Sequence, residues 1–570
     1  MSLTSNNLLK IYNNSKHLQT MLKDSTVINN EINDFFKQTY KLLKLNITQN
    51  LCVKYLLNLI NDYQKIKFTN NNMYIYVKLV EYFQLNIQEE FFDFVIDDHI
   101  LKQNKFYNKL VRCKSINHCI LNKFSKENDV TNNSFAYIFK INKNIHKEIN
   151  TLFSSNIEDN LLNKCLHIVN LNIKNNGNIY NINNLQQLHN LNMSGWFCYI
   201  QHDGISNLSS IKILNVRNIH YITNVNHLQQ LEELDISEKY CGVDQNGISQ
   251  LKYIKILNAN NNYKITDVNH LQQLVELHAC DNCGIDQHGI SNILNIKTLY
   301  VDGNLNITNV NHLQQLEELD ISGNCQVNQN GISQLVTVKI LHANKNDKIT
   351  NVNHLQQLKK LSARDTCGID QNGISNIYSL KILNVDSNNK ITDVNHLQQL
   401  EELNMSSDNV YDNTGVEQNG ISKLTTIKIL NVRNNSNVTN VNHLQQLEIL
   451  KISGYLCAVD QNGISSLLSI KKLYTDNNRK ITNVNHFKKL EELDISNFCG
   501  VNQKGISCLN TIKKLNASNN CKITDVNHLQ QLKELNISGS RCVIDKNGIS
   551  SLLTIKKIKI NTDLNKNFMQ

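Results

Sequence analysis

The stretch Val225-Asn-His-Leu-Gln-Gln-Leu-Glu-Glu-Leu-Asp-Ile236 contains the pattern that decides the fold of this chain. Its first four residues recur along the sequence, with the histidine of each copy at 227, 270, 312, 354, 396, 443, 486 and 528; only the copy at 486 varies, ending in Phe487. Successive copies lie 43, 42, 42, 42, 47, 43 and 42 residues apart, and a second phrase, Gly-Ile-Ser, falls between them. Two phrases with one period predict a tandem array whose units stack into a solenoid.

Each period holds two coils, one of about 23 residues and one of about 20, and both carry the pattern L-x-x-L-x-x-L-x-L. Alternation at the end of this pattern predicts a short strand with Leu234 and Ile236 directed inward and Glu233 and Asp235 directed outward. Counting such coils from Cys165 to Ile560 gives about 19. We therefore expect the repeat array to occupy residues 156–562, with a C-terminal tail at 563–570.

This pattern resembles the leucine-rich repeat. The stretch Lys264-Ile-Thr-Asp-Val268 resembles the I-T-D-I turn of internalin-like repeats. The stretch Cys325-Gln-Val-Asn-Gln-Asn-Gly-Ile332 resembles the cysteine-containing class, although its threonine is replaced, usually by Asp or Asn. The resemblance implies an α/β solenoid, a leucine-rich-repeat horseshoe with a parallel β-sheet on its concave face.

A ladder of cysteines follows the same period, each six residues before a repeat glycine: Cys198, Cys241, Cys283, Cys325, Cys367, Cys457, Cys499 and Cys542. Equivalent positions two coils apart lie ~10 Å from each other if neighbouring strands are ~5 Å apart. A disulfide requires Cα atoms within ~7 Å, and a shared metal ion fails for the same reason. We expect buried, reduced thiols, which indicate an intracellular compartment.

Histidine and glycine ladders accompany the cysteines, as at His270, His312 and His354 and at Gly247, Gly289, Gly331 and Gly373. Each histidine precedes a core residue at a coil corner, so we expect its ring to cap a backbone group rather than bind a metal. The glycines indicate either a backbone turn with positive φ or a close approach of neighbouring coils.

The composition suits a folded protein, with 40% hydrophobic and 19% charged residues. No apolar run approaches the length of a membrane span, and Met1–Lys10 lacks the apolar core of a secretory signal. Proline is absent, while asparagine, lysine and isoleucine are abundant, as an AT-rich genome would produce. The same bias explains the net charge of +9, so a nucleic-acid partner is not indicated. We expect a cytoplasmic protein without a cofactor.

The first 155 residues lack the period. Ile11–Asp24, which ends in Met-Leu-Lys-Asp, resembles a helix of Skp1 and BTB/POZ domains. The segments Leu43–Ile66 and Asn71–Ile100 resemble the parts that follow it. The resemblance covers residues 1–100 and implies a small, mainly helical α+β domain that docks a cullin-type ubiquitin ligase. An unrelated helical cap, or a dimer contact, remains the alternative, and residues 101–155 are predicted to be a helical linker or cap.

Deviations from the consensus are the candidates for binding, because consensus positions serve packing. At the outward strand position most coils carry Asn, Asp, Ser or Lys, but four consecutive coils carry His278, Tyr300, Asp320 and His342. Lys360 and Arg364 follow on the next coil. Tyrosine and arginine are typical interface residues, which predicts a partner-binding stripe, although neutral drift on a solvated surface also explains it.

The 47-residue gap inserts about five residues around Ser407–Thr414. Val410 and Tyr411 there are possible loop contacts, or the insertion is simply tolerated.

Apart from residues that recur with the repeat itself, the sequence contains no nucleotide loop, paired-acid cleft or Ser/His/Asp set. We therefore expect no enzymatic activity. The leading hypothesis is a target-recruiting adaptor for a cullin-type ubiquitin ligase, with the concave face binding a target protein. The alternative is a plain interaction scaffold. Composition and architecture together resemble the leucine-rich-repeat multigene proteins of AT-rich large DNA viruses such as entomopoxviruses, which implies a host-interaction role in the host cytoplasm.

Overall fold

The structure is a computed structural model that describes residues 151–153, 157, 159–162, 165–407 and 415–560. The Skp1/BTB-like module predicted for residues 1–100, most of the predicted linker, the predicted tail, and Val410 with Tyr411 lie outside these residues. Two compact units share the described chain. One runs to Ile236 and includes Tyr240–Leu251, and the other contains Ser237–Lys239 and continues from Lys252.

The described part of the first unit is a stack of short parallel strands. Its strands are β1 (Thr151–Phe153), β2 (Asn170–Asn172), β3 (Asn190–Asn192), β4 (Ile213–Asn215) and β5 (Glu233–Asp235). Each pairs with the next in parallel and in register. The helical turns are α11 (Asp159–Leu162), η3 (His202–Gly204) and α12 (Gln245–Ile248). The first strand among the described residues, β1, lies slightly ahead of residue 156, where the repeat array was expected to begin.

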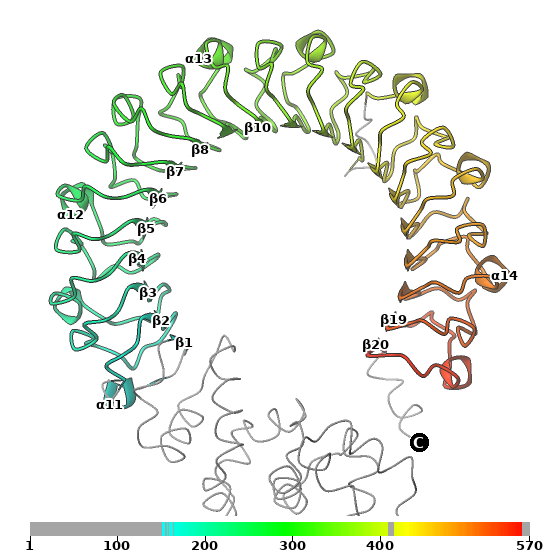
Figure 1. The fold of residues 1–570 in the computed structure, drawn as a ribbon, viewed down its shortest axis with the longest axis horizontal. Coiled ribbons are helices and arrows are strands. Elements are labelled where there is room, and N and C mark those ends of the chain that lie inside the picture. The colour runs from blue at the N-terminus through cyan, green and yellow to red at the C-terminus, as the bar shows by residue number, and fades with distance from the viewer. Residues whose placement is uncertain (1–150, 154–156, 158, 163–164, 408–414, 561–570) are drawn as a thin grey trace, which may run out of the picture. The chain divides into compact units, whose positions relative to one another are not determined.

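The second unit continues the same architecture over many more coils. Its strands are β6 (Ile256–Asn258), β7 (Glu276–His278), β8 (Thr298–Tyr300), β9 (Glu318–Asp320), β10 (Ile340–His342), β11 (Lys360–Ser362), β12 (Ile382–Asn384), β13 (Glu402–Asn404), β14 (Ile429–Asn431), β15 (Ile449–Lys451), β16 (Lys472–Tyr474), β17 (Glu492–Asp494), β18 (Lys514–Asn516), β19 (Glu534–Asn536) and β20 (Lys557–Lys559). The helical turns are α13 (Gln329–Ile332), η4 (Asn372–Ile374), η5 (Gln418–Ile421), η6 (Asn462–Ile464), α14 (Gln503–Ile506) and η7 (Asn547–Ile549). Within this unit the strands line the inner side of a curve and the helical turns lie outside (Figure 1).

The predicted alternation of core and surface residues is confirmed. Leu234 is 3% exposed and Leu257 0%, whereas Glu233 and Asp235 on either side of Leu234 are only half-buried. Nearly every strand repeats this pattern of one buried residue between two outward ones, because successive side chains of a strand point to opposite faces. The chain makes about 18 turns from β2 to β20, close to the 19 coils expected. Each unit is therefore a parallel-sheet solenoid of repeats with leucine at the core positions.

The two coil types differ in how they turn after the strand. Most coils with a ladder cysteine form a short helical turn, as at α13, whose N-cap Asn328 accepts hydrogen bonds from the backbone N–H groups of Asn330 and Gly331. The other type carries a buried asparagine that the sequence analysis did not single out. The side-chain amide of Asn346 donates to the backbone oxygens of Ile321, at 2.7 Å, and Val327, at 3.2 Å. This ladder satisfies carbonyl groups that the turns would otherwise bury without a donor.

The glycine ladder results from close approach of coils rather than from positive φ. At Gly331 an added Cβ would overlap the carbonyl oxygen of Thr308 in the preceding coil, and the ladder glycines are not among the residues with positive φ. The ladder histidines contact the backbone next to these glycines, as the sequence predicted. His312 Nε2 lies 2.9 Å from the carbonyl oxygen of Ile290, and His354 Nε2 lies 2.9 Å from that of Ile332.

The ladder thiols are mostly buried, although Cys542 is half-buried near the end of the described coils, where fewer described residues pack over it. Burial raises the pKa of Cys325 and Cys367 to about 11 and that of Cys457 to about 12, so these thiols stay protonated at neutral pH. Within the described residues, no helix combines the length and apolar character needed to cross a bilayer.

Candidate functional site

The predicted stripe forms one continuous row on the second unit. His278, Tyr300, Asp320 and His342 are the last residues of β7, β8, β9 and β10. In the parallel register His278 pairs with Tyr300, Tyr300 with Asp320, and Asp320 with His342. All four are half-buried outward residues, and we call the surface formed by outward strand residues the strand face.

His278 and Tyr300 are held in place by stacking and by carboxylates. The His278 and Tyr300 rings stack with centroids 4.5 Å apart and an interplanar angle of 27°. The Tyr300 hydroxyl donates to Glu318 Oε1 at 2.8 Å, and His278 Nε2 lies 2.7 Å from Glu276 Oε1. Glu276 and Glu318 begin their strands, so the support comes from a second outward column next to the row.

Acidic groups dominate the electrostatics of these coils. Burial, with the nearby carboxylates of Asp320 and Asp281, raises the pKa of Asp302. Burial and the hydrogen bond to Glu318 raise the pKa of Tyr300, which therefore stays protonated. Burial lowers the pKa of His342 against the opposing effect of Asp320. The row thus presents a protonated tyrosine and two histidines among several carboxylates.

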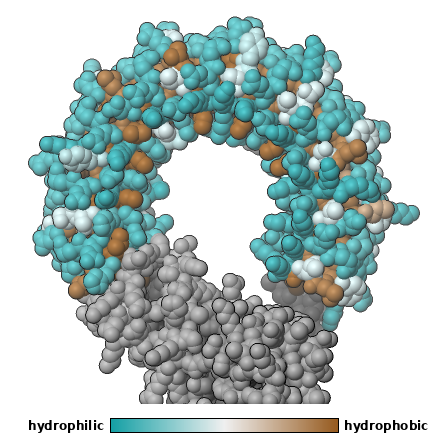
Figure 2. All heavy atoms as spheres, in the orientation of Figure 1, coloured by the Kyte–Doolittle hydropathy of each residue, from teal (hydrophilic) through white to brown (hydrophobic). Residues whose placement is uncertain are grey.

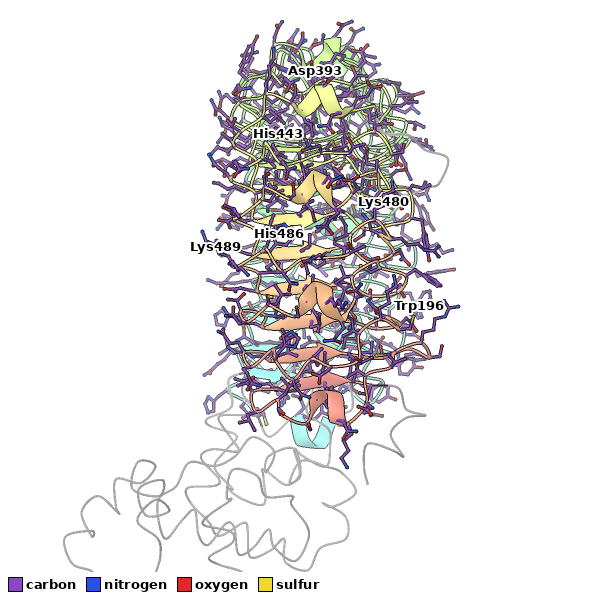
Figure 3. The ribbon with its side chains drawn as sticks, turned by 90° about the vertical axis from the view of Figure 1, so that its right-hand side faces the viewer. Trp196, Asp393, His443, Lys480, His486 and Lys489 are labelled. Atoms are coloured by element: carbon purple, nitrogen blue, oxygen red, sulfur yellow. The ribbon has the colours of Figure 1, made fainter. Side chains whose placement is uncertain are left out.

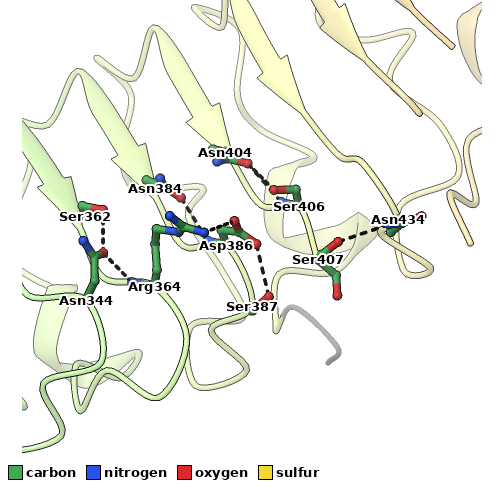
Figure 4. Close-up of polar contacts among 10 residues, drawn as sticks. All are labelled: Asn344, Ser362, Arg364, Asn384, Asp386, Ser387, Asn404, Ser406, Ser407 and Asn434. Atoms are coloured by element: carbon green, nitrogen blue, oxygen red, sulfur yellow. Dashed lines mark hydrogen bonds and ion pairs between the residues drawn. The ribbon is translucent and has the colours of Figure 1, made fainter. Parts of the chain in front are cut away.

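Lys360 and Arg364 belong to the next coil but are placed differently from each other. Lys360 begins β11 and faces outward, half-buried. Arg364 follows the strand by two residues, and its guanidinium lies 2.8 Å from Asp386 Oδ2, whose side chain is 4% exposed. Figure 4 shows this ion pair among the polar contacts of the turns after the strands. Because its charge already pairs with Asp386, Arg364 serves this turn more than it serves an incoming partner.

The same turns carry a run of hydrogen bonds that keeps the ends of the strands in register. The Ser362 hydroxyl donates to Asn344 Oδ1 at 2.6 Å, and the Arg364 backbone N–H donates to the same oxygen at 3.1 Å. Further along, the Ser406 hydroxyl donates to Asn404 Oδ1 at 2.8 Å (Figure 4). The contacts of Asn344 join two neighbouring coils at this edge of the strand face.

Exposed aromatic side chains on the first unit were missed by the sequence analysis. Trp196 is 55% exposed and Tyr240 45%, and their ring centroids lie 4.7 Å apart. A second pair, Tyr199 and Tyr221, has centroids 6.4 Å apart. The sequence could have indicated these residues, because Trp196 and Tyr240 stand just before the ladder cysteines Cys198 and Cys241. On the face that Figure 2 shows, the described residues are mostly hydrophilic, with apolar residues in small separate groups.

Among the described residues, neither the grouping of potential metal ligands nor the ladder thiols indicates a reactive centre. Within it, no group of three or more His, Cys, Asp or Glu side chains is arranged to hold a metal ion. The buried ladder thiols are poor nucleophiles, because the thiolate is the reactive form and burial disfavours it. The side chains of the row therefore offer an incoming partner ring surfaces and hydrogen-bonding groups.

No family model and no curated protein matches the chain. Among solved structures, it is similar to the functional domain of InlJ from Listeria monocytogenes, which includes a cysteine ladder. The two are 21% identical, the match covers 58% of this chain and 74% of that one, and the TM-score is 0.38. A TLR13–ssRNA13 complex is 18% identical over 72% and 73% of the chains, with a TM-score of 0.44. A leucine-rich-repeat protein of Leptospira interrogans is 16% identical over 70% and 99%, with a TM-score of 0.38.

Proposed function

We propose that this chain binds a partner protein on the strand face of its second unit. The observation that carries the proposal is the row of His278, Tyr300, Asp320 and His342 on four adjacent strands. Rigid strands present these side chains at a small ordering cost, and tyrosine commonly contributes much of the energy of a protein interface. The surrounding carboxylates favour a partner surface that carries lysine or arginine.

The test is affinity purification of the full chain with mass spectrometry, comparing the wild type with the triple variant H278A/Y300A/H342A. We expect the principal partner to bind the triple variant at least about tenfold more weakly. The control I382T/I429T/I449T changes outward residues of β12, β14 and β15 on the same face and should keep the partner. Unchanged partners in the triple variant would show that the row is ordinary surface.

We further propose that binding at the strand face serves recruitment to a cullin-type ubiquitin ligase, through residues 1–100. Support comes from the resemblance of Ile11–Asp24 and the segments after it to Skp1 and BTB/POZ domains. The resemblance to proteins of large DNA viruses suggests a host protein as the target.

Co-purification of the full chain with a tagged cullin tests the adaptor role. We expect the cullin to be retained by the wild type and by H278A/Y300A/H342A, and to be lost when Met21 and Leu22 are replaced by aspartate. If the wild type retains no cullin, the remaining role is an interaction scaffold in which residues 1–100 act as a cap or dimer contact. Size-exclusion of the full chain would then distinguish a monomer from a dimer.

A cytoplasmic location is part of this proposal. It is supported by the buried ladder thiols such as Cys325 and Cys457, because thiols in such number suit a reducing compartment. Fractionation of cells that produce the tagged chain should find it with cytoplasmic markers, and recovery in the secreted fraction would contradict the proposal.

A further inference from the structure

A second surface of the second unit alternates exposed aromatic rings with arginines. Tyr455 and Phe498 have ring centroids 6.0 Å apart. The guanidinium carbon of Arg479 lies 5.8 Å from the centroid of Tyr455 and 5.3 Å from that of Phe498. The guanidinium carbon of Arg541 lies 4.5 Å from the Phe498 centroid. We call these four residues the cation–aromatic stack.

The repeat framework places each member of the stack. Tyr455 stands two residues before Cys457, and Phe498 and Arg541 stand directly before Cys499 and Cys542. Arg479 follows directly after Asn478, which is 1% exposed and donates to the backbone oxygens of Ile452 and Val459. Because these neighbours belong to the cysteine and asparagine ladders, the stack is built on rigid turns rather than on a free loop.

The stack is exposed and surrounded by positive charge. Tyr455 is 56% exposed and Phe498 39%, and both arginines are exposed. Lys480 Nζ donates to the carbonyl oxygen of Cys457 at 3.0 Å, which draws its ammonium group to the same flank. Figure 3 shows Lys480 on this flank, with His443, His486 and Lys489 toward the opposite one.

A second lysine repeats this arrangement. Lys522 Nζ donates to the carbonyl oxygen of Cys499 at 3.1 Å. The turn that contains Arg479 also contains the carboxylate of Asp476, which opposes the positive charge. Four cations accompany this carboxylate, so the charge of the flank is positive, opposite to that of the row at His278 and Tyr300.

The geometry favours a carboxylate-bearing ligand over a nucleic acid. Nucleic-acid bases bind by stacking on an open aromatic face, but guanidinium groups already lie over the rings of Tyr455 and Phe498. Stacking uses the flat face of a guanidinium and leaves its N–H groups, which lie in its plane, for ligands. A carboxylate matches these N–H groups in a bidentate arrangement.

We propose that the cation–aromatic stack binds an acidic segment of a partner protein. The guanidinium carbons of Arg479 and Arg541 lie 5.3 and 4.5 Å from the same Phe498 centroid, so they are at most about 10 Å apart. An extended peptide rises ~3.3 Å per residue, so a segment of about three residues spans the two guanidinium groups. This site does not depend on the strand face, and its partner segment carries the opposite charge to the one proposed there.

Fluorescence anisotropy with a fluorescein-labelled peptide of ten glutamates tests the proposal on the full chain. We expect the peptide to bind the wild type, and R479Q/R541Q to weaken binding at least about tenfold, because charge-assisted hydrogen bonds are lost. The control K489Q/K504Q removes two exposed positive charges outside the stack and should change binding by no more than about twofold. Phe498→Leu, which removes the ring beneath both guanidiniums, should weaken binding with little change in the thermal melting curve.

Three results would overturn the proposal. The first is an absence of peptide binding to the wild type. The second is equal weakening in R479Q/R541Q and K489Q/K504Q, which would mean that the peptide senses only the net charge of +9. The third comes from a parallel titration with a decamer of uridylate. If its binding is tighter than that of the peptide and depends on Arg479 and Arg541, the stack is a nucleic-acid site instead.

Discussion

Asn346 illustrates how single polar residues hold the coils. Its amide group donates to the carbonyl oxygens of Ile321 and Val327, and its side-chain oxygen accepts from the backbone N–H of Lys348 at 3.1 Å. The side chain is 1% exposed, so its hydrogen bonds to the backbone replace the ones that water would otherwise make. Equivalent asparagines, such as Asn388 and Asn478, make the same contacts in other coils.

We predict that Asn346→Leu lowers the free energy of unfolding by about 2–4 kcal/mol, because two buried carbonyl groups lose their donor. Urea denaturation followed by circular dichroism measures the change. Asn389→Ala alters an exposed asparagine and should remain within about 0.5 kcal/mol of the wild type. Equal effects from both substitutions would mean that the buried asparagine adds nothing specific.

Cysteine reactivity should separate into two classes. Cys508 and Cys521 are exposed, whereas Cys283, Cys367 and Cys457 are buried, and burial raises the pKa of Cys283 and Cys457 to about 12 and that of Cys367 to about 11. We predict that an aromatic disulfide reagent at pH 8 modifies Cys508 and Cys521 rapidly, and the buried ladder only after denaturant is added. The variant C508S/C521S should lose two thiols from the fast phase. Fast modification of ladder thiols, identified by peptide mapping, would contradict their burial.

At the scale of the coil, contact between backbones decides the spacing. The φ of Gly331 is not positive, so its backbone conformation does not require glycine. Its packing does, because an added Cβ would overlap the carbonyl oxygen of Thr308 and would lie 3.1 Å from the Cα of Asn309. Gly373, Gly420 and other ladder glycines meet a threonine carbonyl in the same way. A methyl group at any of these positions would push neighbouring coils apart.

We therefore predict that Gly331→Ala destabilises the second unit by about 2 kcal/mol or more, since backbone atoms cannot give way as a flexible side chain can. The midpoint of urea unfolding measures the effect. Gln334→Ala, an exposed change in the same corner of the coil, is the matched control and should have little effect. A harmless Gly331→Ala would show that the coils can separate at small cost.

At the scale of the whole molecule, two histidines of the ladder, His227 and His486, make stability depend on pH. Burial lowers the pKa of His227 in the first unit and of His486 in the second below the ordinary value. The unfolded chain then binds more protons than the folded one as the pH falls through about 6.5. The stabilising contribution is present above this pH and is lost below it.

We predict that the melting temperature of the full chain falls between pH 7.5 and pH 5.5, as measured by circular dichroism. His486→Gln replaces the ring with an amide that can still donate to the carbonyl oxygen of Ile464, so this variant should show a shallower decrease. A melting temperature that rises on acidification would contradict a lowered histidine pKa in the folded chain.

The candidate site could be predicted in outline but not in its contacts. Period and alternation place His278, Tyr300, Asp320 and His342 outward on successive strands, and the register of the sheet agrees. The sequence carries no information on whether rings in neighbouring coils stack, because that depends on side-chain rotamers and on the distance between coils. The same holds for the pairing of Arg364 with Asp386.

The repeated leucines, and the phrases that recur with them, were sufficient for the solenoid of parallel strands, because each coil can bury its apolar residues only against its neighbours. Which polar groups meet across coils was decided by the tertiary structure. The buried contacts of Asn346, the close packing at Gly331 and the stack of Tyr455, Arg479, Phe498 and Arg541 join residues about 20 or more positions apart in sequence. Their energies depend on separations of a few ångströms, which only the stacked coils set.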